Sequence, residues 1–148
     1  TAFTFPVGPI SSEAQRLLEV TKASVFKAID AAKPGNRLGD IGHAVQKYAE
    51  SHGYSVVRDL CGHGIGRSLW EEPQVPNYGE QGRGTRLKPG MVIAVEPMIC
   101  VGAHEVMVLE DEWTTVTADG GLAAHFEHTI AILSDGPEIL TVNPVLWG

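Results

Sequence analysis

The residues with the clearest capacity for chemistry are one histidine and two glutamates in short apolar segments. His63 stands between two glycines, Glu96 follows the apolar run 91–95, and Glu127 lies within the strand-like run 123–130. A carboxylate in a hydrophobic strand is costly unless another group compensates its charge. A divalent metal ion is the simplest compensation, and a set of His and Glu ligands suits Zn, Mn, Co or Fe.

Each of these residues also has an ordinary structural interpretation. A histidine between glycines is typical of a surface turn, and one solvent-facing glutamate in a strand is common. Pro97 directly follows Glu96 and removes a donor from the strand ladder, which marks an edge or a bulge that re-aims a side chain. His125 is either a partner of the nearby Glu127 or a strand histidine on the opposite face, whereas alternation points His128 away from Glu127 and favours a packing or hydrogen-bonding role.

The segments that must position these residues follow a simple order along the chain. Hydrophobic periodicity predicts helices over 12–32 and 38–52, separated by a Lys-Pro-Gly stop. The Pro- and Gly-rich segment 71–90 reads as a long ordered loop. Strands are expected over 91–100, 104–110, 113–117, 122–133 and 137–142. Helices followed by strands predict a single α+β domain over 1–148, with the two helices packed on a mainly antiparallel sheet.

Composition excludes several classes of function. The net charge is −7 and no Lys/Arg cluster stands out, so a nucleic-acid partner is not expected. No run of 18 apolar residues is present, which argues against a membrane span, and the N-terminus does not have the pattern of a signal peptide. Cys61 and Cys100 form neither a disulfide framework nor a zinc-knuckle spacing, so we expect reduced thiols and a cytoplasmic location.

Five segments, taken in order, resemble the C-terminal half of bacterial type I methionine aminopeptidases. These segments are His63-Gly64-Ile65-Gly66, Glu71-Glu72-Pro73, Val95-Glu96-Pro97-Met98, Trp113-Thr114 and Phe126-Glu127-His128-Thr129. The resemblance covers essentially the whole chain. It implies half of a pita-bread fold, in which two N-terminal helices pack on a curved, mainly antiparallel sheet.

The resemblance also implies a set of site residues. Members of this family hold two divalent ions, Co, Mn, Fe or Zn, with two aspartates from the first half and His, Glu and Glu from the second. The second-half ligands correspond to His63, Glu96 and Glu127, with Glu127 bridging the ions. His63 and Glu96 take the catalytic positions, and Glu96 is the base for the water between the ions. Leu69, Trp70 and Trp113 correspond to residues that line the pocket for the substrate.

Two departures from the family pattern affect the expected activity. The chain begins at Thr1, after the position expected for the second metal aspartate, so it looks like a fragment or a processed product. Trp70 stands where the family has a histidine that hydrogen-bonds the substrate. An indole donates one hydrogen bond but cannot accept one or shuttle a proton, so we expect the lone chain to be weak or inactive.

Three functional hypotheses remain open from the sequence. The first is a metal-dependent aminopeptidase segment that removes N-terminal methionine from peptides when the site is completed by a missing first half or by a second copy of the chain. The second is a non-catalytic half-pita-bread module, either a binding domain or an engineered or ancestral-like half-fold, for which a homodimer is one possible assembly. The third is an Xaa-Pro peptidase-like protein, because the wider superfamily shares the His and Glu pattern.

Overall fold

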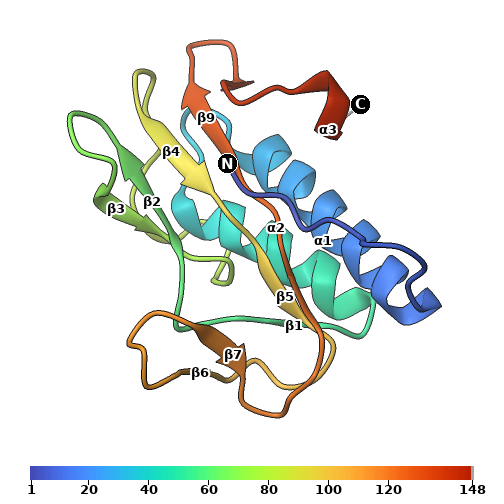
Figure 1. Ribbon diagram of the computed structural model, residues 1–148. Helices are drawn as coiled ribbons and strands as arrows, with labels where there is room; N and C mark the ends of the chain where they lie inside the picture. Colours follow the sequence, from blue (N-terminus) through green and yellow to red (C-terminus); the bar gives the residue numbers. More distant parts are fainter. Residues whose placement is uncertain (148) are drawn as a thin grey trace.

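Two long helices cover one face of a layer of antiparallel strands (Figure 1). The structure is a computed structural model that describes residues 1–147. Helix α1 spans Ser12–Ala31 and helix α2 spans Leu38–Ser51. The buried positions of α1 recur every three or four residues, so one face of the helix packs inward. The predicted α+β class and both predicted helices are confirmed.

The strands form a five-stranded sheet, a three-stranded sheet and a separate hairpin, and all of their pairings are antiparallel. The five-stranded sheet has the order β10-β9-β4-β2-β3, the three-stranded sheet has the order β1-β5-β8, and β6 pairs with β7. The bounds are Ser55–Val56 for β1, Gly62–Ile65 for β2, Glu71–Val75 for β3, Val92–Val95 for β4, Met98–Cys100 for β5, Val106–Val108 for β6, Thr115–Thr117 for β7, Ala123–His125 for β8, His128–Ile132 for β9 and Pro137–Ile139 for β10. A short helix α3 spans Pro144–Trp147.

The prediction of an unbroken loop over 71–90 is wrong at its start. Residues Glu71–Val75 form β3, which pairs with β2 at the edge of the larger sheet. An edge position tolerates Pro73 because the outer side of an edge strand needs no ladder donor. Buried and exposed residues alternate only weakly along this strand, since its first two residues are exposed. Pro73 further argued against a strand in the sequence.

Two of the predicted strands are each divided into two. The run 91–100 is β4 followed by β5, and the run 122–133 is β8 followed by β9. At both divisions the chain passes between the larger and the smaller sheet. The remaining predicted strands exist but are shorter, and α3 was not predicted.

The hydrophobic core lies between the helices and the sheets. It joins the inner faces of α1 and α2 to β4 and β9, with Val25, Val45, Ile93 and Ile130 fully buried. This packing leaves the opposite side of the strands free to carry polar groups. Within the described part of the chain, no helix has both the length and the apolar character needed to cross a membrane.

Candidate metal centre

Glu96 and Glu127 lie at the two points where long strands pass from one sheet to the other. On one side Val95 pairs with His128, and on the other Met98 pairs with His125. The same register on both sides places Glu96 opposite Glu127. The two glutamates are far apart in sequence with no local signal that they face each other, and only strand pairing brings them together.

His63 reaches the same place from β2, the strand next to β4. Its Nδ1 atom donates a hydrogen bond to the Gly64 carbonyl at 2.9 Å, because a carbonyl oxygen can only accept. When the ring is neutral, its lone pair is therefore on Nε2, which lies 3.6 Å from Oε1 of Glu96. Two acceptor atoms that face each other in this way are arranged to share a proton or a cation.

The glycine on the N-terminal side of His63 is required by close packing. A Cβ atom at Gly62 would collide with the Ala94 carbonyl and would lie 3.3 Å from Cγ of Glu96. The absence of a side chain thus lets β2 approach β4 closely enough for His63 to meet Glu96.

The Glu96 carboxyl group has a strongly perturbed acidity. Burial and, secondarily, the negative charge of Glu127 raise its pKa from 4.5 to about 7, against the opposing effect of His63. The backbone carbonyl of Glu96 accepts a 3.0 Å hydrogen bond from Nδ2 of Asn77, which is a buried side chain. Sequence reasoning missed Asn77, because an asparagine after a proline in a loop carries no signal beyond a turn.

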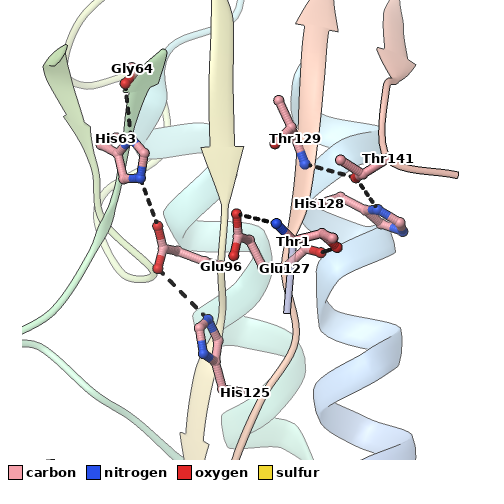
Figure 2. Close-up of polar contacts among 9 residues, drawn as sticks. All are labelled: Thr1, His63, Gly64, Glu96, His125, Glu127, His128, Thr129 and Thr141. Atoms are coloured by element: carbon pink, nitrogen blue, oxygen red, sulfur yellow. Dashed lines mark hydrogen bonds and ion pairs between the residues drawn. The ribbon is translucent and has the colours of Figure 1, made fainter. Parts of the chain in front are cut away.

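Glu127 contacts the first residue of the chain. Its Oε1 lies 3.1 Å from the amino nitrogen of Thr1, and the Thr1 hydroxyl donates to the Glu127 carbonyl at 2.6 Å. Figure 2 shows this contact beside Glu96, with the helices behind the strands. Thr1 therefore lies against both the side chain and the backbone of Glu127.

The structure shows which way each of the two histidines near Glu127 points. His125 lies on the side of Glu96, with its Nε2 atom 3.7 Å from Oε2 of that residue (Figure 2). His128 points the other way and is buried, and its Nδ1 atom contacts the Thr141 hydroxyl at 2.8 Å. The expectation of a packing and hydrogen-bonding role for His128 is confirmed.

The three residues expected to line the substrate pocket are exposed in this chain. Trp70 lies edge-on to His63, with their ring centroids 6.2 Å apart, whereas Leu69 and Trp113 are 66% and 84% exposed. A separate cavity of about 300 Å³ lies between the β6–β7 hairpin and the smaller sheet, and His125 is one of its walls. Its lining does not include Leu69, Trp70 or Trp113. Their assignment to the substrate pocket stays a prediction.

The donor groups fit a divalent ion in their chemistry but do not form a preassembled site. Among residues 1–147, no group of three or more His, Cys, Asp or Glu side chains is arranged to hold an ion. His63 and Glu96 form the close pair, and Glu127 is near enough to perturb Glu96. An imidazole lone pair with two carboxylates is a donor set for Zn, Mn, Co or Fe.

Comparison with known proteins places the chain in a family. Residues 1–134 match metallopeptidase family M24. A methionine aminopeptidase of Clostridium acetobutylicum is 57% identical over 141 residues, which are 95% of this chain and 56% of that protein. Methionine aminopeptidase 1 of Bacillus subtilis is 54% identical over 141 residues, which are 95% of this chain and 57% of that protein.

Solved structures support the same relationship. The crystal structure of methionine aminopeptidase from Thermotoga maritima matches with a TM-score of 0.93 and 50% identity, over 95% of this chain and 57% of that chain. The prolidase from Pyrococcus horikoshii matches with a TM-score of 0.72 and 25% identity, over 95% of this chain and 35% of that one. The chain spans a little over half the length of the methionine aminopeptidases that it matches. Its pita-bread half-fold and its sequence show that it belongs to metallopeptidase family M24.

Proposed function

We propose that this chain forms one side of the active site of a metal-dependent methionine aminopeptidase. The observation that carries the proposal is the meeting of the His63 lone pair with the Glu96 carboxylate, opposite Glu127. These are the residues that the family resemblance assigns as the second-half ligands. Peptides with an N-terminal methionine are the proposed substrates, as the names of the relatives suggest.

The residues of the chain have separate tasks in this proposal. A bound divalent ion supplies polarisation of the scissile carbonyl and activation of water near neutral pH. The Gly64 carbonyl keeps His63 in the tautomer that can ligate. Glu96, with a pKa of about 7, can hold or release a proton at Oε1 near neutral pH, which suits a general base. Glu127 adds the second carboxylate and the charge that raises the pKa of Glu96.

We propose that the remaining ligands come from a second polypeptide segment. The family uses two first-half aspartates, and within residues 1–147 no aspartate contacts His63, Glu96 or Glu127 through an ion pair or hydrogen bond. A first-half segment could supply them, whereas a second copy of this chain would bring another His-Glu-Glu set. The two unpaired thiols, Cys61 and Cys100, support the proposal of a reducing, cytoplasmic location.

Trp70 limits the expected rate. Its indole lies beside His63, at the position where the family has a substrate-binding histidine. Loss of one donor to the transition state typically lowers the rate by about 10²–10³-fold. The same feature favours the second candidate function, a non-catalytic half-module that keeps the fold and part of the donor set.

Peptide hydrolysis tests the proposal. Met-Ala-Ser and Ala-Pro peptides are incubated with the chain and Co²⁺ or Mn²⁺, with and without a separately expressed first half that contains the two aspartates. Release of methionine that depends on metal and is abolished by Glu127→Gln is the expected result, and Glu138→Gln, at an exposed position of β10, is the control. Cleavage of Ala-Pro alone would indicate the Xaa-Pro alternative. No turnover with the first half at any metal concentration would favour the non-catalytic module.

A further inference from the structure

The imidazole of His125 has one ring nitrogen, Nε2, that is buried within the described part of the chain. Its Nε2 atom is inaccessible to solvent and has no hydrogen-bond partner among the described residues. A buried polar atom without a partner destabilises the fold and calls for an explanation. The ring as a whole is 38% exposed, so simple crowding does not force Nε2 inward.

Nε2 of His125 faces the carboxyl group of Glu96. Nε2 of His125 lies 3.7 Å from Oε2 of Glu96, while Oε1 of the same carboxylate faces His63 at 3.6 Å. Figure 2 shows Glu96 between the two rings, with one ring toward each oxygen. A shift of less than about 1 Å would bring His125 within hydrogen-bond distance, since N–H···O bonds span roughly 2.7–3.2 Å.

The backbone of His125 is held firmly enough to direct its ring. Its amide donates to the Thr4 hydroxyl at 3.0 Å, and its carbonyl accepts from that hydroxyl at 2.7 Å. On its other side the residue pairs with Met98, two positions beyond Glu96. The ring and the carboxylate therefore extend from paired strands whose register is set.

We propose that His125 is a positioning residue that donates its Nε2 proton to Oε2 of Glu96 and keeps Oε1 turned toward His63. Glu127 cannot take this role, because a carboxylate offers only acceptor oxygens to a second carboxylate. Partners that orient a metal-binding carboxylate in this way tune its affinity for the ion. The inference rests on the proposed function for its consequence in metal binding, but the proposed hydrogen bond does not itself require a metal.

The first test is independent of metal. The ring nitrogens of ¹⁵N-histidine-labelled, metal-free chain are observed by NMR at about pH 8.5, well above the ordinary histidine pKa. An Nε2-protonated His125 whose resonance moves in Glu96→Leu, and not in the exposed-surface control Glu138→Gln, is the expected result. A His125 ring protonated at Nδ1, or one indifferent to Glu96→Leu, would overturn the proposal even if the chain hydrolyses peptides.

The second test separates positioning from a role in packing. His125→Gln keeps an N–H donor, and His125→Leu removes it with little change in size. Co²⁺ affinity by calorimetry should fall roughly 10–100-fold in His125→Leu, with an altered Co²⁺ absorption spectrum, and should be largely restored in His125→Gln. His104→Gln, in the loop before β6, is the control. Equal losses in both His125 variants, with an unchanged spectrum, would assign His125 to packing.

Discussion

Replacing Glu96 by glutamine should change how the stability of the metal-free chain depends on pH. A carboxyl group whose pKa is raised by folding binds its proton more tightly in the folded chain than in the unfolded one. The resulting stabilisation is fully present below the ordinary pKa of 4.5 and is lost as the pH rises to about 7. Since each tenfold change in proton affinity is about 1.4 kcal/mol, the loss amounts to about 3 kcal/mol.

The measurement is the difference in the free energy of unfolding between Glu96→Gln and wild type. Glutamine has the size of a protonated glutamate, so the two chains should be nearly equal in stability near pH 4.5. Above pH 7 the variant should be more stable by about 3 kcal/mol. The variant is compared with wild type at each pH because the stability of both chains also depends on other groups. Burial lowers the pKa of His125 and His128, which makes both chains more stable as the pH rises to 6.5.

Urea denaturation of chelator-treated protein at pH 4.5, 6 and 8 provides the assay, with Glu138→Gln as a matched control at an exposed glutamate. Saturating Co²⁺ should restore the stability of the wild type at pH 8 and have little effect on Glu96→Gln. A difference between variant and wild type that stays constant over this range would refute the reasoning, because it would mean that Glu96 is ionised in the folded chain at ordinary acidity.

Three further predictions test the geometry and chemistry of the site. Trp70→His should raise the rate of methionine release by about 10²–10³-fold in chain assembled with a first half, and an unchanged kcat would show that the indole does not limit the reaction. His63→Ala should weaken Co²⁺ binding by more than about 10-fold in calorimetry, whereas His43→Ala, on the half-exposed side of α2, should bind as the wild type does. Gly62→Ala should lower the free energy of unfolding by about 1–3 kcal/mol, because the new Cβ meets the Ala94 carbonyl; a chemical denaturation curve that matches the wild type would contradict this packing.

Several parts of the fold were accessible from sequence because their causes are local. The helices follow from apolar residues at helical spacing and from the Lys33-Pro34-Gly35 stop, where Gly35 adopts a φ of 92°. Pro97 correctly indicated an irregularity next to Glu96. The β3 strand was not predicted, because it is its pairing with β2, and not its own composition, that makes it a strand.

The sequence by itself determined the residue types at the site, the glycines around His63 and the resemblance to the family. The tertiary structure alone decided which of these groups meet. Strand register is a long-range property, so it took the folded chain to place Glu96 opposite Glu127 and to turn His125 toward Glu96. The raised pKa of Glu96 has the same origin, since burial and a neighbouring charge exist only after distant segments pack together.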